Sequence, residues 1–204
     1  MHGVLDSWFV EQVKPRLKGK ASMVRFADDA LLIFEFKEDM RRVMEVLPKR
    51  LGKFGLRMNE QKTRVKRFNP PRATSGPKTD TIDFLGFTHY WGRSRKGRWV
   101  VKRKTQKERL TRSLRKIAQW CKKHRHDPLR EQQRMLNRKL RGHYSYYGIT
   151  PNSRSIALFW EEVKRIWLKW LNRRSRNPHL NWDTFNLLLK RYPLEKPRIY
   201  HSFI

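Results

Sequence analysis

The sequence has little of three things: cysteine, acidic residues and long apolar runs. A single cysteine, Cys121, excludes an internal disulfide and a zinc site built on several thiolates. No apolar run approaches the length needed to cross a membrane, and the first residues lack the profile of a signal peptide. Only 18 residues are acidic, against 49 lysines and arginines. These absences argue against a disulfide-stapled secreted domain and an integral membrane protein, and we expect a cytoplasmic protein.

The excess of positive charge is what most restricts the possible partners. The formal net charge is +31; residues 1–100 carry a net +11 and residues 101–204 a net +20. Such a field attracts polyphosphate, so nucleic acid is the expected partner and binding should weaken steeply with salt. A membrane surface also attracts basic chains, but here the aromatic residues follow helical core spacing instead of gathering on one exposed face. We therefore expect association with nucleic acid and not with membranes.

Two adjacent acids, Asp28 and Asp29, are the most informative feature of the first half. They lie between apolar runs at 23–26 and 30–34, and both runs are typical of short buried strands. The pair is therefore predicted in the tight turn of a β-hairpin. Adjacent carboxylates repel each other unless a cation lies against them, and a divalent metal such as Mg²⁺ is the usual solution. An ordinary exposed turn without a metal is the alternative that the residues alone leave open.

The first hundred residues alternate helical and extended patterns. Apolar residues at helical spacing predict two helices, the second of which is closed by Gly55. A strand-rich region follows, with a basic turn between Arg93 and Arg98 at its tip. Besides the hairpin at the acidic pair, the expected elements are a helix over 4–17, a helix over 38–54, extended chain over 56–68, a surface loop over 69–80 and a hairpin or meander over 82–101.

The second half is helical, and three apolar stripes mark three main helices. Lysine and arginine dominate their outer faces, so the helices can form a compact bundle. A short further helix is predicted near 182–189. We expect an α+β fold: a β-hairpin, a helix and a small antiparallel sheet in residues 1–104, then an all-α bundle in residues 105–204. The stripes are Leu110, Leu114, Ile117 and Cys121; Leu136, Leu140, Tyr144 and Tyr147; and Ile156, Phe159, Trp160, Val163, Trp167, Trp170 and Leu171.

Six ordered blocks of residues give the chain a specific resemblance. In order they are VRFADD at 24–29, LPKRL at 47–51 with FGL at 54–56, NEQKT at 59–63, DFLGF at 83–87, LNRKLRGHY at 136–144 and RIWLKWLNRR at 165–174. Together they resemble the C-terminal part of a bacterial group II intron reverse transcriptase, the intron-encoded maturase of a mobile genetic element. The resemblance implies that residues 1–104 are the second half of a polymerase palm and that residues 105–204 are a helical thumb, or X domain.

The resemblance also implies roles for individual residues. The family copies RNA into DNA with two Mg²⁺ ions, and Asp28 and Asp29 match the metal-binding acids of its palm hairpin. Lys62 matches a lysine that could steady the charge of the incoming triphosphate. The family usually has tyrosine where this chain has Phe26. The primer-grip turn is matched by Phe84, Leu85 and Gly86.

One departure from the family pattern bears on catalysis. Two-metal phosphoryl transfer needs a further carboxylate, which the family places roughly a hundred positions before the acidic pair. Only 27 residues precede Asp28, and the acids Asp6 and Glu11 lie in the predicted first helix. The fingers have no counterpart either. We therefore expect the chain to be inactive alone as a polymerase; a natural truncation, a fragment, and a split enzyme whose N-terminal half acts in trans stay open.

The thumb of this family grips the template–primer duplex and the intron RNA. In this chain the cations of the second half have almost no acidic neighbours, which favours a polyanion partner over a merely solvated face. The grip should follow backbone and shape, as is usual for A-form duplex. Tyr146, which lies off the inner stripe, is the expected aromatic contact. The candidate cations are Arg112, Arg115, Lys116, Arg138, Lys139, Arg141, Arg173, Arg174 and Arg176.

Three functions therefore stay open from the sequence. The first is a reverse transcriptase part whose chemistry needs the other half. The second is a non-catalytic, maturase-type splicing cofactor that binds intron RNA. The third is a general basic nucleic-acid-binding protein, which the ordered blocks make the weakest of the three.

Overall fold

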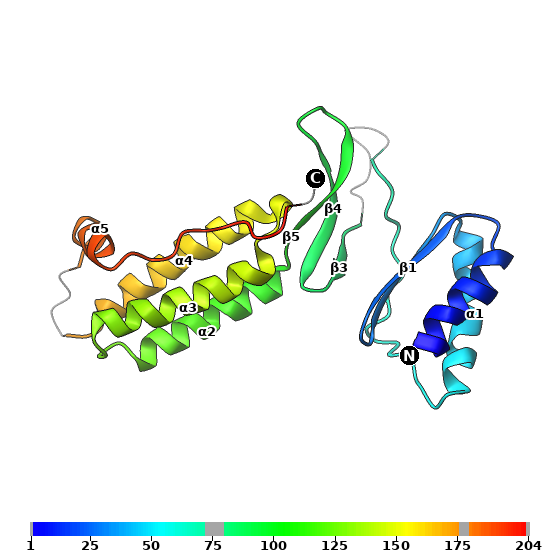
Figure 1. The fold of residues 1–204 in the computed structure, drawn as a ribbon, viewed down its shortest axis with the longest axis horizontal. Helices are drawn as coiled ribbons and strands as arrows, with labels where there is room; N and C mark the ends of the chain where they lie inside the picture. The colour runs from blue at the N-terminus through cyan, green and yellow to red at the C-terminus, as the bar shows by residue number, and fades with distance from the viewer. Residues whose placement is uncertain (1, 72–79, 176–179, 203–204) are drawn as a thin grey trace. The chain divides into compact units, whose positions relative to one another are not determined.

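The structure, a computed structural model, describes residues 2–71, 80–175 and 180–202 (Figure 1). The chain forms two compact units, Met1–Arg67 and Phe68–Ile204. In the described part the fold is mixed α/β with two small antiparallel sheets, one in each unit. The division of function near residue 104 falls within the second unit and stays a prediction. Most of the predicted loop over 69–80, and Arg176, lie outside the described residues.

The first unit joins a helical N-terminal segment, a β-hairpin and one long helix. The N-terminal helix is present as predicted, but it is wound mainly as π-helix and closes with a 3-10 turn at Pro15. The long helix contains Pro48, and Gly55 beyond its end has φ +67°, a conformation that glycine adopts without strain. The elements are η1 (His2–Asp6), η2 (Phe9–Val13), η3 (Lys14–Arg16), β1 (Ala21–Phe26), β2 (Asp29–Phe34) and α1 (Lys37–Gly52).

The β1–β2 hairpin of the first unit is covered on one face only. Ala21 and Met23 face the core, whereas Val24 and Phe26 are 49% and 65% exposed. The expectation of two buried strands is therefore wrong for half of their residues, because successive side chains point to opposite faces. The buried core of this unit consists of Leu5, Trp8, Phe9, Val13, Ala21, Val43, Leu47 and Leu51.

The second unit begins with a three-stranded antiparallel meander. Its strands are β3 (Ile82–Phe84), β4 (Phe87–Arg93) and β5 (Trp99–Thr105), in the order β3-β4-β5. This arrangement confirms the predicted hairpin or meander, and the predicted basic turn joins β4 to β5. Residues 56–68, all of them described, form no strand, but the turn predicted there is present at Asn59.

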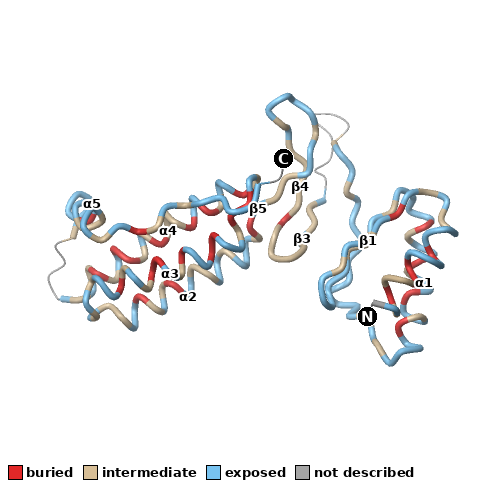
Figure 2. Tube along the Cα trace, in the orientation of Figure 1, coloured by how far each residue is buried: buried red, intermediate tan, exposed pale blue. Residues whose placement is uncertain are grey.

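Three long helices complete the second unit and lie side by side (Figure 1). Buried residues gather on the faces that these helices turn toward one another (Figure 2), which confirms the predicted stripes. No helix in the described ranges is long and apolar enough to cross a membrane. The helical elements are α2 (Lys107–Lys123), α3 (Leu129–Tyr147), η4 (Thr150–Asn152), α4 (Ser153–Leu171) and α5 (Trp182–Arg191).

Two contacts hold the ends of these elements together. The buried amide of Asn152 accepts a hydrogen bond from the Thr105 backbone at 2.7 Å and donates to the Tyr147 carbonyl at 2.9 Å, which links β5, α3 and η4. The C-terminal segment returns along α3, where the amides of Tyr200 and His201 donate to the Gly148 carbonyl. A Cβ on Gly148 would lie 2.3 Å from the Tyr144 carbonyl oxygen, so this close approach requires glycine.

Candidate functional site

Of the acidic pair, Asp28 lies in the hairpin turn, as predicted, and Asp29 is the first residue of β2. Phe26 pairs with Asp29 across the hairpin, so Ala27 and Asp28 form a two-residue turn between β1 and β2. Ala27 has φ +51°, a left-handed conformation that costs a residue with a Cβ about 1 kcal/mol. Both carboxylate-bearing residues are exposed. The turn therefore presents two hard oxygen ligands to solvent on a defined backbone, as a divalent cation would require.

Arg25 is the cation beside this turn, and the sequence prediction did not single it out. Its Nε and Nη2 donate to the two carboxylate oxygens of Asp6, both at 2.6 Å, and its Nη1 donates to the Ala27 carbonyl at 2.8 Å. The hydrogen bonds that Arg25 donates to Asp6, together with the charges of Asp6 and Asp28, raise the pKa of Arg25. Arg25 belongs to the VRFADD block, but only the fold brings Asp6 to it. The pair ties the N-terminal helix to the strand that leads into the turn.

The described residues do not complete a metal site. Within the described ranges, no group of three or more His, Cys, Asp or Glu side chains is placed to hold a metal ion. The acidic pair could supply two carboxylates, and Asp6, the acid tied to this hairpin, is held by Arg25. Lys62 is exposed in the Asn59 turn, where its backbone amide donates to the Asn59 carbonyl and side-chain oxygens. No described contact joins Lys62 to Asp28 or Asp29.

The predicted primer-grip residues form a second tight turn, between β3 and β4. Phe84 pairs with Phe87, and the two residues between them, Leu85 and Gly86, have φ +49° and +75°. Positive φ at both central positions is the type I′ geometry that suits the twist of a hairpin, and Leu85 is strained in it. The amide of Gln106, just after β5, donates to the Gly86 carbonyl at 3.0 Å and fixes the turn from the neighbouring strand.

Two tyrosines in the last turn of α3 contact this Leu85–Gly86 turn. Tyr146 Oη donates to the Leu85 carbonyl at 2.9 Å, and its ring stacks on Phe87 with centroids 5.9 Å apart. A Cβ on Gly86 would lie 2.9 Å from Tyr147 Oη, so a glycine is needed beneath that hydroxyl. Tyr146 was predicted as a nucleic-acid contact; it is 53% exposed, but its hydroxyl is engaged by the turn.

Four of the predicted cationic contacts project from the helices without a described partner. Arg112, Arg115 and Lys116 are exposed on α2, and Arg138 is exposed on α3. In the described ranges their side chains make no hydrogen bond or ion pair. Arg134 and Arg130 lie about one and two turns before Arg138 on the same helix face and are also exposed. The prediction missed these two, although their spacing of four residues could have shown them.

The other four described candidates are at least partly engaged within the protein. Lys139 Nζ lies 5.6 Å from the Trp120 ring centre, and Arg173 lies over Trp170 at 5.0 Å. Arg141 is 3.6 Å from a carboxylate oxygen of Glu195. Such contacts leave charge available but reduce the freedom of the side chain to follow a ligand.

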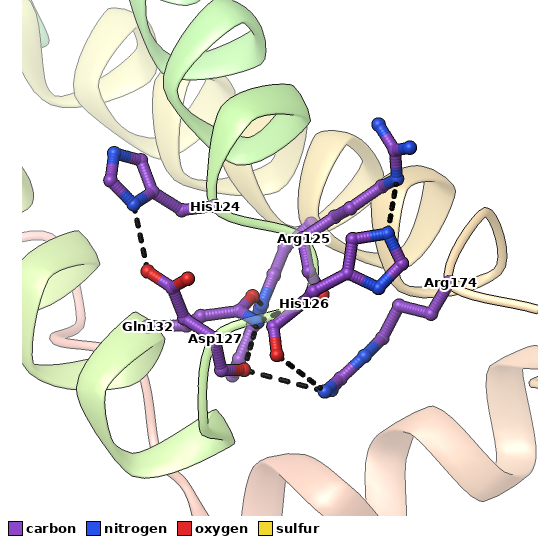
Figure 3. A network of polar contacts seen from close by, with 7 residues as sticks. His124, Arg125, His126, Asp127, Gln132 and Arg174 are labelled. Carbon is purple, nitrogen blue, oxygen red and sulfur yellow. Dashed lines mark hydrogen bonds and ion pairs between the residues drawn. The ribbon is translucent and has the colours of Figure 1, made fainter.

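Arg174 has a structural role at the far end of the helices (Figure 3). Its Nη2 donates to the carbonyls of His126 and Asp127 in the loop between α2 and α3. In the same loop His124 Nδ1 lies 2.7 Å from an Asp127 carboxylate oxygen, and the buried Gln132 amide donates to the Asp127 carbonyl at 2.8 Å. The histidines here therefore belong to a loop-stabilising network.

Two models of known protein families match the chain. The model of the reverse transcriptase (RNA-dependent DNA polymerase) family matches residues 3–89, which include the acidic turn and the Leu85–Gly86 turn predicted as the primer grip. The model of the group II intron maturase-specific domain matches residues 110–186, which include the exposed cations of α2 and α3. A search of curated proteins gave no match. The chain belongs to the group II intron reverse transcriptase/maturase family.

Proposed function

We propose that this chain supplies the acidic hairpin of a reverse transcriptase palm together with a helical thumb that binds intron RNA and template–primer duplex. Both families imply binding of intron RNA. In this proposal residues 1–104 act as the second half of the palm and residues 105–204 as the thumb, so the compact second unit contains the primer grip as well. The clamp of Tyr146 and Tyr147 on the Leu85–Gly86 turn supports this functional link between sheet and helices.

The reverse transcriptase family implies a divalent metal, generally Mg²⁺. Asp28 and Asp29 fit this role in part, because both carboxylates are exposed on a turn whose backbone is fixed by β1–β2 pairing. When bound, Mg²⁺ would neutralise negative charge on the reacting phosphates. Arg25 would hold the turn by its bonds to Asp6 and to the Ala27 carbonyl. Lys62 would add a positive charge for the triphosphate.

The observation that bears most on activity is the number of carboxylates at the turn. Asp28 and Asp29 supply two, and no third acid in the described residues completes a metal-binding group with them. In this proposal polymerase chemistry requires a further carboxylate beyond the acids described at the turn, in the same polypeptide or from a half supplied in trans. The same observation favours the second candidate function, a maturase-type splicing cofactor that binds intron RNA without copying it. Exposed cations on α2 and α3 would serve either function.

Primer extension on an RNA template with Mg²⁺ separates these functions. The chain alone is expected to extend no primer, and a mixture with a complementary N-terminal half is expected to extend one. Asp28→Asn should abolish extension by the mixture, whereas Glu45→Gln, an equal change of charge at an exposed site of α1, should not. Extension by the chain alone would contradict the need for another carboxylate. Failure of the mixture, with RNA binding intact, would favour the cofactor.

RNA binding by the helices has its own test. The triple variant Arg112→Gln, Lys116→Gln and Arg138→Gln should weaken the affinity for intron RNA and lower the salt slope by about 2 to 3, near 0.9 for each phosphate contact. A control triple in α1 (Arg41→Gln, Arg42→Gln, Lys49→Gln) removes the same charge from exposed sites of the first unit. Equal effects of the two triples would argue for a general basic nucleic-acid-binding protein.

A further inference from the structure

The β4–β5 hairpin carries a concentration of positive charge that the proposed thumb surface does not include. Between Phe87 and Thr105 there are seven lysines and arginines and no acidic residue. Cations this close together raise the free energy of the folded hairpin unless an anion lies near them. Either this repulsion destabilises the hairpin without any benefit, or the hairpin is a surface that binds a polyanion.

Part of this charge is used to build the hairpin itself. Arg93 Nη1 donates to the Gly97 carbonyl at 2.7 Å, and its guanidinium lies 4.1 Å from the Trp99 ring centre. Lys104 Nζ lies 5.4 Å from the Tyr90 ring centre. These cations rest on aromatic rings and on backbone, so they stiffen the two strands up to the turn.

The tip of the hairpin leaves three cations free on a fixed backbone. The Ser94 amide donates to the Arg98 carbonyl at 2.8 Å, the Arg98 amide donates to Ser94 Oγ at 3.1 Å, and Gly97 takes φ +75°. Arg95, Lys96 and Arg98 are exposed. In the described ranges their side chains make no hydrogen bond or ion pair. A turn that is closed internally thus displays three unpaired positive charges within four residues.

We propose that this tip, Arg95, Lys96 and Arg98, binds the phosphate backbone of double-stranded RNA. The inference rests on the proposed RNA binding but assigns it a second surface, separate from the exposed cations of α2 and α3. Arginine forms paired hydrogen bonds with phosphate, and RNA duplex is gripped mainly through its backbone. The charged ends of Arg95, Lys96 and Arg98 would contact phosphate oxygens, and such contacts carry no sequence information. Binding through phosphate alone should therefore be independent of sequence.

The test is the salt dependence of the whole chain's affinity for a labelled RNA duplex, measured by fluorescence anisotropy. Arg95→Gln, Lys96→Gln and Arg98→Gln together should lower the magnitude of the slope of log K against log salt by about 2 to 3. The α1 triple (Arg41→Gln, Arg42→Gln, Lys49→Gln) should change it by less than about 1, since those charges make no phosphate contact. Equal changes for the two triples would overturn the proposal.

Three further measurements keep the outcome unambiguous. Arg95→Lys with Arg98→Lys retains the charge and should retain the slope; a loss as large as that of the glutamine triple would refute an ionic contact. Anionic lipid vesicles should bind both triples alike, and a defect of the tip triple on vesicles but not on RNA would assign the tip to a membrane surface instead. The α2–α3 triple distinguishes the surfaces: if it weakens RNA binding and the tip triple does not, the thumb proposal stands and this one falls.

Discussion

His143 lies buried on α3 with its ring stacked on Phe159, their centroids 3.7 Å apart. Burial lowers the pKa of His143 from 6.5 to about 4. Above pH 6.5 the folded and unfolded chains both hold a neutral imidazole, so this group contributes no pH dependence there. Between those two values the unfolded chain takes up a proton that the folded chain does not. The free energy of unfolding should therefore decrease as the pH is lowered from 6.5, by up to about 3 kcal/mol once the pH is below 4.

His143→Phe removes the titrating group and preserves a ring for the stack on Phe159. Urea unfolding at pH about 7 and about 4.5 should show a smaller loss of stability for this variant than for the parent chain. The control is His126→Phe, because His126 is exposed. A loss in His143→Phe equal to that of the parent would mean that other groups cause the acid sensitivity.

Tyr146 gives a second prediction at the scale of one residue. Tyr146→Phe deletes the hydrogen bond to the Leu85 carbonyl but keeps the stack on Phe87, so it should cost about 1 kcal/mol. The strained turn should open more often, which is measurable as faster hydrogen exchange at the Gln106 amide that donates to Gly86. Tyr200→Phe, at an exposed ring whose hydroxyl has no described hydrogen bond, is the control. Unchanged exchange at Gln106 would show that Tyr146 does not hold the turn.

The β1–β2 hairpin gives a prediction at the scale of the element, since its outer face is apolar and open. Val24→Thr with Ile33→Thr should change stability by less than about 0.5 kcal/mol, because both side chains are half exposed. The pair should also reduce self-association and binding of a hydrophobic dye. Val43→Thr makes the same exchange at a residue that is 2% exposed and should destabilise by about 1 to 3 kcal/mol. If the double variant self-associates as much as the parent chain, the apolar surface responsible lies outside this hairpin face.

The elements were largely predictable because their signals are local. The helices α2, α3 and α4 follow three apolar stripes, and the turns at Asp28 and Gly86 follow from the residues around them. The sequence could not predict which side chains far apart along the chain contact one another in the fold. Asp6 binds Arg25, Tyr146 binds Leu85 and Asn152 binds Thr105, and these partners are 19, 61 and 47 residues apart. Nor could the apolar runs at 23–26 and 30–34, which lack a clear alternation of apolar and polar residues, show that one hairpin face stays open.

At the scale of the whole molecule, charge and core are shared unequally between the two units. Residues 68–204 hold 33 basic and 9 acidic residues, a net +24, whereas residues 1–67 hold 16 and 9, a net +7. The second unit also has the larger buried core, with thirteen buried residues in its main cluster against eight in the first. The second unit, which is proposed to bind most of the RNA, has the stronger repulsion between its positive charges. Its larger buried apolar surface offsets that repulsion.

This inequality predicts that the chain unfolds in two steps. Trp8 is buried in the first unit, and the other seven tryptophans belong to the second. Tryptophan fluorescence during urea unfolding should therefore show an early change from Trp8 and a later one from the rest. Trp8→Phe should remove the early change, and Trp182→Phe, at an exposed site of α5, should leave it in place. A single transition shared by fluorescence and circular dichroism would mean that the smaller core is stabilised by the larger one. The acidic turn would then depend for its stability on the unit proposed to bind RNA.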